Sequence, residues 1–232
     1  MKIDVLDKGF IKAVDILGTD LTVVNAARIS FGKIKSELDD DDRKLMRYLA
    51  KHKHYSPFRH IMVTFHIKAP EFVMRQWYKH VVGIETTSSY PTKDHAWNEI
   101  SGRYIPIEDF HIPTELREAP ANRKQGSGPG LIEGHIRDEY LRAWENTTRR
   151  LVALYESMIG SGIAHEQARC ILPLTLYSEV YWTASFQAIA NFLELRLDSH
   201  AQLEIRQYAM AVEEIMVRFF PETMAAWFTN KE

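Results

Sequence analysis

The chain has 232 residues, 45% of them hydrophobic, and a formal net charge of −2 at pH 7. This length and composition suffice for one large core, and the near-neutral charge argues against a nucleic-acid-binding protein, which needs a basic face. A single cysteine excludes an internal disulfide framework and a zinc site built from cysteine pairs, so we expect a reducing, cytoplasmic location. The first residues lack the apolar core of a signal peptide, and no stretch resembles a membrane span. We therefore expect a single domain over residues 1–232, without nucleic-acid or membrane partners.

The N-terminal pattern predicts strands followed by a helix. Residues 3–16 should form two strands joined by a turn, and a helix should begin at Thr19 or Asp20 and end near residue 30. Arg28 lies in that helix among small and apolar neighbours, so it needs a partner. That partner is either a nearby carboxylate, in a structural salt bridge, or a ligand.

An acidic run at residues 39–42 is typical of a solvated helix start, because negative charge is favourable at a helix N-terminus. Leu45, Met46 and Leu49 follow at the spacing of a buried stripe. We assign this run no chemistry.

Four histidines in the next part of the chain raise the question of a metal site: His52, His54, His60 and His66. No HExxH pattern is present, and carboxylate or cysteine ligands do not stand at fixed spacing from them. We expect no metal.

After a strand over 61–67, a helix is expected from Pro70, which suits a first turn. On this helix Arg75 and Lys79 are four residues apart and would share one face, at a mutual cost that a bound anion would remove. Gln76 and His80 form a second pair at the same spacing and could hold the edge of a heterocycle.

The segment Asn98–Tyr104, with the sequence NEISGRY, adds anion-binding groups. Ser101 offers a hydroxyl, Gly102 lets a ligand approach the backbone, and Arg103 carries a guanidinium suited to a phosphate. Together with the cationic helix these groups are typical of a nucleotide pocket. The alternative is a solvated helix face and an ordinary Ser-Gly turn.

The C-terminal half is mostly helical by pattern. Glycine and proline predict a loop within 113–130, with a flexible part over 118–130. The elements expected after it are helices over 132–159 and 164–172, a strand over 176–184, and helices from 185 to 219 with a break at 198–199.

Two arginines in these helices have apolar neighbours, and an unpaired buried guanidinium would cost several kcal/mol. Arg169 stands beside Cys170, for which a small core residue is a better interpretation than a nucleophile, since apolar residues follow it. Arg196 lies near Asn191 and His200, which favours a ligand. Its alternative partners are three carboxylates: Glu194, Asp198 and Glu204.

The runs RQWYKH and NEISGRY resemble the signature of the flavin-dependent thymidylate synthases, and HKHYSPF, ARCILP and NFLELR with HAQ match the same family in order. The resemblance implies an α+β fold with a small, mostly antiparallel sheet covered by long helices, in a homotetramer with shared sites. It implies methylation of dUMP to dTMP with methylenetetrahydrofolate as carbon donor, FAD as redox cofactor and NADPH as reductant.

The resemblance also implies roles for single residues. Arg196 would stabilise charge on the uracil, and Ser101 would bind and polarise it, as the catalytic residues. Contacts to dUMP would come from Gln76, Lys79, Glu99, Ile100, Ser101, Gly102, Arg103, Arg169 and Arg196. Contacts to FAD would come from Ser56, Lys79, His80, Val81, Asn98, Glu99, Ser185, Gln187, Asn191 and His200. His54 and Tyr104 would line the folate side.

The chain departs from the family pattern near the flavin, at Arg59, Lys79, Val81, Ser185 and Gln187. The spacer before the Ser-Gly-Arg motif is also longer, which indicates an inserted loop at 83–96. These departures leave two alternatives open: hydroxymethylation or methylation of another pyrimidine nucleotide (dCMP or dUMP) on the same fold, and a non-catalytic nucleotide-binding relative.

Overall fold

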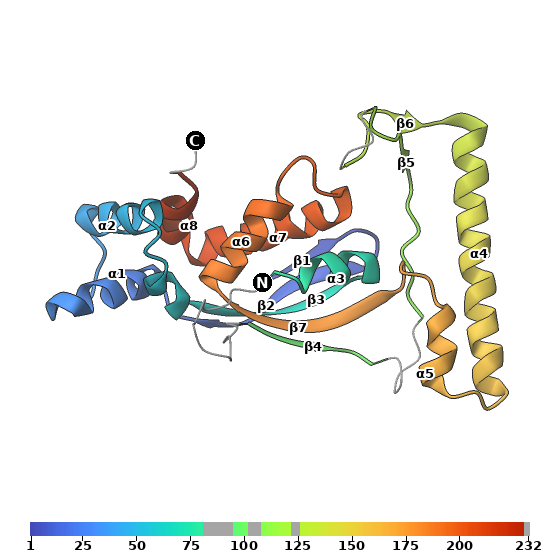
Figure 1. Cartoon of the computed structure of the whole chain (residues 1–232), viewed down its shortest axis with the longest axis horizontal. Coiled ribbons are helices and arrows are strands. Elements are labelled where there is room, and N and C mark those ends of the chain that lie inside the picture. Colours follow the sequence, from blue (N-terminus) through green and yellow to red (C-terminus); the bar gives the residue numbers. More distant parts are fainter. Residues whose placement is uncertain (81–94, 102–107, 122–125, 230–232) are drawn as a thin grey trace, which may run out of the picture.

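The computed structural model describes residues 1–80, 95–101, 108–121 and 126–229 (Figure 1). Within them, an antiparallel five-stranded sheet has the order β1-β2-β3-β7-β4. Its strands are β1 (Lys2–Val5), β2 (Gly9–Leu17), β3 (Met62–Pro70), β7 (Tyr177–Ser185) and β4 (His95–Glu99). The predicted hairpin and the two later strands are confirmed. The edge strand β4 was not predicted, and it contains the last two residues of the proposed loop 83–96.

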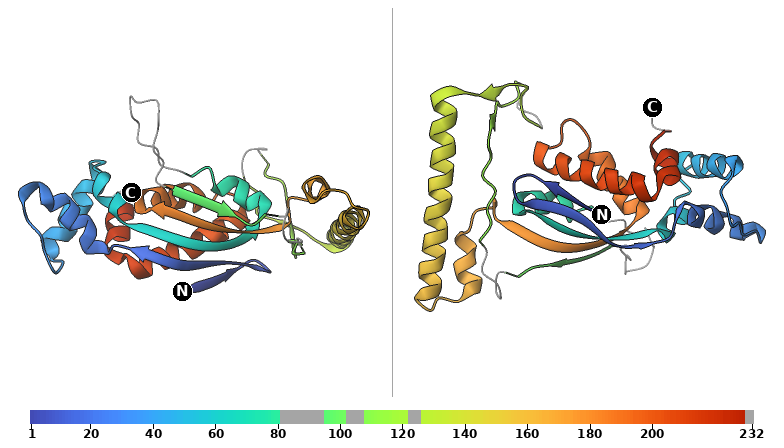
Figure 2. Two further views of the ribbon diagram at one scale, coloured as in Figure 1. Left: turned by 90° about the horizontal axis from the view of Figure 1, so that it is seen from below. Right: turned by 180° about the vertical axis from the view of Figure 1, so that it is seen from behind.

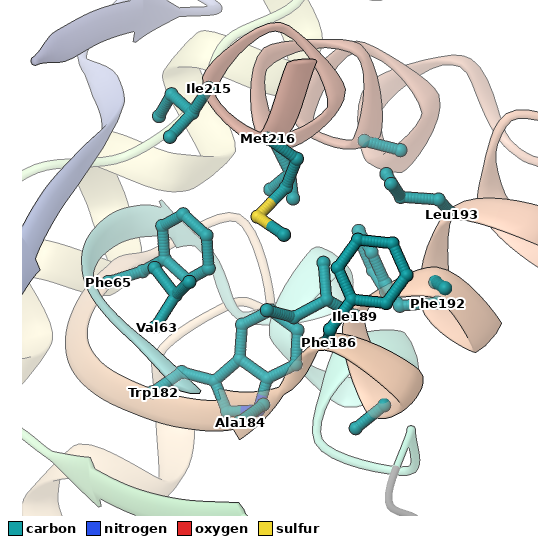
Figure 3. Packing of buried hydrophobic residues seen from close by; sticks show 14 of the residues in the cluster. Val63, Phe65, Trp182, Ala184, Phe186, Ile189, Phe192, Leu193, Ile215 and Met216 are labelled. Carbon is teal, nitrogen blue, oxygen red and sulfur yellow. The ribbon is translucent and has the colours of Figure 1, made fainter. Parts of the chain in front are cut away.

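One face of the sheet is covered by helices α6 (Phe186–Arg196) and α7 (Leu203–Phe219), as Figures 1 and 2 show. Alternate residues of β3 and β7 point to this face because side chains alternate along a strand. Figure 3 shows Phe65, Trp182 and Met216 meeting there, and all three are fully buried. The opposite face carries polar residues, with the hydroxyls of Thr64 and Thr183 2.9 Å apart. The core therefore lies between the sheet and the C-terminal helices.

A helical group packs at one end of the sheet. It contains α1 (Asp20–Arg28), α2 (Asp40–Lys51) and α8 (Pro221–Phe228), with the short helices η1 (Ile29–Phe31) and η2 (Ser56–His60). The predicted start of α1 is confirmed, but α8 was not predicted. The buried carboxylate of Asp20 accepts hydrogen bonds from the backbone N–H groups of Glu222 (3.2 Å) and Thr223 (2.9 Å), and so ties the first turn of α8 to α1.

The acidic run that caps α2 and forms its first turn is only partly solvated, which corrects the expectation from sequence. Asp42 is fully buried, and its carboxylate accepts from Arg28 Nε at 2.8 Å and from Lys35 Nζ at 2.6 Å. The pKa of Asp42 lies below its ordinary value, since the hydrogen bonds of Lys35, the Asp39 backbone and Arg28 outweigh desolvation. Arg28 thus takes the structural salt bridge that was one of its two predicted roles.

At the other end stands α4 (Gly134–Gly160), beside α5 (His165–Ala168) and η3 (Arg169–Ile171) (Figure 1). A pair of two-residue strands, β5 (Leu116–Arg117) and β6 (Leu131–Ile132), precedes it. The amphipathic pattern of α4 is confirmed, but its apolar stripe is largely exposed in one chain: Ile136 is 46%, Tyr140 60% and Leu154 51% exposed.

The expected α+β class with a mostly antiparallel sheet and long helices is confirmed. Among the described residues, no helix has both the length and the apolarity needed to cross a membrane.

Candidate functional site

Two pockets together contain seven of the fifteen predicted site residues that the structure describes. The Ser101 pocket, of about 550 Å³, is lined by Glu71, Arg75, Glu99, Ile100, Ser101, Arg169 and neighbouring residues of the segment 170–178. The Arg196 pocket, of about 620 Å³, is lined by Gln76, Glu194, Arg196, Asp198, His200, Gln202 and their neighbours. The motifs are thus divided between two places in one chain.

Strand β4 positions the Ser101 pocket. It pairs with β7, and the N–H of Ile100 still donates to the carbonyl of Glu179 at 2.9 Å, so Ser101 follows directly after a fixed sheet edge. Glu99 is held by the Ser178 hydroxyl, which donates to Oε1 at 2.5 Å. Arg169 approaches from η3 on the other side, with an exposed side chain. A hydroxyl and a guanidinium facing a common space are the groups that bind a phosphate.

Glu71 lines the same pocket, although it was not predicted as a site residue. It is the first residue of α3 (Glu71–Trp77), and its N–H donates to the carbonyl of Leu176 at 2.9 Å. Burial, and then a hydrogen bond with Glu99, raise the pKa of the Glu71 carboxyl to about 7. The signal for this residue in the sequence was weak, since a glutamate after proline is common at helix starts.

In the Arg196 pocket, the guanidinium contacts an imidazole rather than a carboxylate. Arg196 Nε donates to His80 Nε2 at 2.9 Å, so this nitrogen of His80 is unprotonated. His80 is 8% exposed and packs edge-on against Phe192 at 5.3 Å between ring centroids. Burial and the charge of Arg196 lower the pKa of His80 to about 4.

The carboxylates expected as alternative partners of Arg196 bind elsewhere. Glu194 accepts from Trp227 Nε1 at 2.5 Å, Glu204 from Arg117 at 2.6 Å, and Asp198 pairs with His200 at 2.9 Å. No carboxylate pairs with Arg196 in the part of the chain that the structure describes. Burial lowers the pKa of Arg196, as expected for a cation without an anionic partner. Its remaining N–H groups are therefore suited to a ligand.

Helix α3 is shorter than predicted, and this corrects the expected arrangement of two pairs four residues apart. The helix ends at Trp77, and the N–H of His80 donates to the Trp77 carbonyl at 2.9 Å in a tight turn. His80 is consequently drawn into the core, whereas Lys79 is exposed and lines neither pocket. Trp77 is fully buried and stacks on Phe192, which explains why the chain turns there.

The other predicted cofactor residues lie around the start of α6 and on nearby surfaces. Ser185 is fully buried, and its Oγ accepts from the N–H of Ala188 at 3.2 Å as the helix cap. Gln187 and Asn191 follow on α6 and are half-buried, while Ser56 at the start of η2 is exposed.

Some predictions fall on exposed or undescribed residues. His54 is exposed near the ring of Tyr48, and Asn98 is exposed on β4. Cys170 is exposed because η3 lies at the surface, so the predicted core role is wrong. Its thiol donates to the Glu166 carbonyl at 3.3 Å. Four predicted site residues lie outside the described residues: Val81, Gly102, Arg103 and Tyr104. Most of the proposed loop, residues 83–94, also lies outside them.

No group of three or more histidine, cysteine, aspartate or glutamate side chains is placed to hold a metal within the described ranges. The polar groups that line the two pockets include arginine, serine, carboxyl and imidazole side chains. Together they suit an anionic ligand with a polar ring.

Comparison with known proteins gives one consistent result. Residues 13–222 match the family model of thymidylate synthase complementing proteins, Thy1. Flavin-dependent thymidylate synthases from Thermosipho melanesiensis and Thermus thermophilus are 39% and 40% identical, over 98% of this chain and 93% and 78% of theirs. A crystal structure of a UMP/dUMP methylase, PolB from Streptomyces cacaoi bound with 5-Br dUMP, superposes with a TM-score of 0.80 at 30% identity, covering 98% of this chain and 97% of that one. These matches confirm the resemblance, the enzyme class and the flavin dependence that the motifs predicted: the chain belongs to the flavin-dependent thymidylate synthase family.

Proposed function

We propose that this protein catalyses the reductive methylation of dUMP to dTMP, with methylenetetrahydrofolate as carbon donor, FAD as redox cofactor and NADPH as reductant. The observation that carries the proposal is the half-buried Arg196, which has an imidazole and no carboxylate as its partner among the described residues. Such a preorganised cation stabilises negative charge that develops on a substrate ring.

In this proposal the Ser101 pocket binds the phosphate of the nucleotide. Ser101 and Arg169 supply a hydroxyl donor and a bidentate cation, and Arg103, which lies outside the described residues, would add a second cation. Gln76 would fix the edge of the ring beside Arg196; its Nε2 donates to Gln202 Oε1 at 2.8 Å, which orients the amide. The residues bind and orient the nucleotide, as expected where a cofactor supplies the redox chemistry.

We expect FAD to be held by hydroxyl, amide and imidazole groups, which can form hydrogen bonds with its phosphates and with the polar edge of the isoalloxazine. His80 stays neutral because of its low pKa, so it holds Arg196 in place without adding charge. Asn191 and His200 would contact the cofactor from α6 and from the segment after it, with Ser56 and Gln187 near the start of that helix. When bound, the flavin supplies the electrons of the reductive step.

We also propose that the protein is a cytoplasmic homotetramer with sites shared between subunits. The exposed apolar stripe of α4 supports association, since such a stripe is typical of an interface. Sharing predicts that hybrids of Arg169→Ala and Arg196→Ala subunits regain activity, because some sites combine an intact Ser101 pocket with an intact Arg196 pocket. Hybrids no more active than either variant alone would contradict sharing.

The test of the function is product analysis with the purified flavoprotein. Incubation with dUMP, labelled methylenetetrahydrofolate and NADPH should give labelled dTMP, and omission of any one should prevent it. Release of a hydroxymethylated nucleotide, or turnover of dCMP alone, would contradict the proposal. A flavin-free protein that binds nucleotide without turnover would favour the non-catalytic alternative.

The similarity to PolB favours UMP as a second candidate substrate, since that protein is described as a UMP/dUMP methylase. Competition between UMP and dUMP in one reaction compares their kcat/KM values directly. We expect a higher kcat/KM value for dUMP. Equal values for the two nucleotides would indicate a UMP/dUMP methylase, as PolB is described.

A further inference from the structure

Two carboxyl groups face each other in the Ser101 pocket. Glu71 begins α3, directly after β3, and Glu99 ends β4. Strands β3 and β4 are the two neighbours of β7, so the sheet brings these ends together across β7, where Ser178 lies between them. The arrangement is therefore fixed by the sheet and not by a flexible loop.

A hydrogen bond between two carboxyl groups requires one proton, and the geometry indicates which of them carries it. Glu99 accepts from Ser178 Oγ at 2.5 Å and from Trp97 Nε1 at 3.3 Å, so donors already surround it and favour its ionised form. Glu71 is half-buried and shares the hydrogen bond with Glu99. Its raised pKa, about 7, agrees with Glu71 as the protonated member.

The charged and titratable groups around the pair come from three elements besides β4. Arg75 faces it from α3, Arg169 and Cys170 from η3, and Tyr177 from β7. The nearby Glu179 is turned away, toward His66 at 2.9 Å. With one shared proton, the two carboxyl groups and the two arginines have a net charge of +1. With none, the net charge is zero, and a phosphate dianion would meet two carboxylates.

We propose that Glu71 is a further nucleotide-binding residue, and that the Glu71–Glu99 pair takes up one proton from solution when the phosphate of a nucleotide enters the Ser101 pocket. The inference rests on the proposed function, which places a nucleotide there. A dianion near the pair favours its protonated form in the same way that a nearby like charge raises the pKa of any carboxyl group. Nucleotide affinity should then fall as the pH rises above the pKa of the free pair.

The experiment is isothermal titration calorimetry of dUMP into the flavin-loaded enzyme at pH 8, in two buffers with different ionisation enthalpies. At this pH the nucleotide phosphate, with a second pKa of about 6, is already a dianion. We expect an uptake approaching one proton per site and a Kd that increases up to about tenfold for each further pH unit. The variant Glu71→Gln, which mimics the protonated acid, should bind with almost no proton uptake and with a flatter pH dependence.

The matched control is Glu37→Gln, an exposed carboxyl between η1 and α2, which should behave as the parent. Binding of dUMP without proton uptake in the parent overturns the inference and leaves the proposed function intact, whereas absence of dUMP binding overturns both. Equal uptake in the parent and in Glu71→Gln overturns the assignment to Glu71. The proton uptake of the parent is measured without any variant. If Glu71→Gln does not fold, infrared spectroscopy of the parent replaces this variant, and the band of a protonated carboxyl should appear when dUMP binds. A missing band refutes the inference.

Discussion

Replacing Arg196 tests the centre of the proposed chemistry. Arg196→Ala removes the cation that faces the Arg196 pocket, and it also leaves His80 Nε2 without its donor. Because His80 loses a neighbouring positive charge, its pKa should rise from about 4. The variant therefore changes two observable properties at once, catalytic rate and the titration of one histidine.

The magnitude follows from what the guanidinium does in the structure. Nε is engaged by His80, which leaves the two terminal nitrogens for the substrate. Losing a single preorganised donor to a developing anion costs about 10²–10³ in kcat, or roughly 2.7–4 kcal/mol. Since Arg196 also provides a full charge in a half-buried site, we expect the upper end, about a thousandfold.

The assay is single-turnover formation of dTMP, with the flavin absorbance recorded on the same sample. FAD should remain bound, because the guanidinium acts on the substrate ring. Arg196→Lys should also fail, since a lysine keeps the charge but cannot both contact His80 and present a fork of donors. Turnover of dUMP by Arg196→Ala at close to the parent rate would refute the assignment, and loss of FAD from the variant would show that Arg196 serves the cofactor instead.

Three further predictions use other parts of the structure. Asp42→Ala should lower the free energy of unfolding by about 3 kcal/mol, because its two cationic partners lose their buried carboxylate. The control, Asp41→Ala, removes an exposed carboxylate and should change the free energy of unfolding by less than about 0.5 kcal/mol. Urea denaturation measures both variants, and equal midpoints would contradict the role of Asp42. Arg169→Ala should weaken dUMP binding by about 1.5–3 kcal/mol with an unchanged flavin spectrum, and unchanged affinity in calorimetry would exclude Arg169 from the pocket. His80 binds its proton less tightly in the folded than in the unfolded chain, so the stability that neutral His80 contributes should be fully present above pH 6.5 and be lost as the pH drops toward 4. The melting temperatures of the parent and of His80→Asn should therefore converge as the pH falls through this range. Parallel curves of melting temperature against pH would contradict this role of His80.

The regular parts of the fold were predictable because their signals are local. Alternation in β3 and β7 and the helical spacing in α4 and α7 come directly from one buried face per element. Strand β4 was missed because its five residues follow a polar stretch and its one partner among the described residues is β7, more than 70 residues away. Helix α8 was missed because its first turn depends on Asp20, which is distant in sequence.

Residue type alone predicted part of the lining of the candidate site, while the roles of these residues stay predictions. Ser101 and Arg169 line one pocket, as a phosphate site requires, and Arg196 faces another. The contact between Arg196 and His80 was not predictable, because it depends on α3 ending at Trp77 rather than continuing to residue 80. Burial of Trp77 against Phe192 decides that point, and burial by a distant helix leaves no signal in the local sequence.

The division of the site between two pockets follows from α3 itself. Arg75 lines the Ser101 pocket and Gln76 lines the Arg196 pocket, and consecutive residues of a helix point about 100° apart. A nucleotide whose phosphate lies beside Ser101 and whose ring lies beside Arg196 of the same chain would have to reach around this helix. If Arg196 instead comes from a neighbouring subunit, no such path is needed, and each pocket completes a site with its counterpart across an interface. The separation of the two pockets within one chain is thus the physical reason to expect that association of subunits, and not folding alone, creates the complete active site.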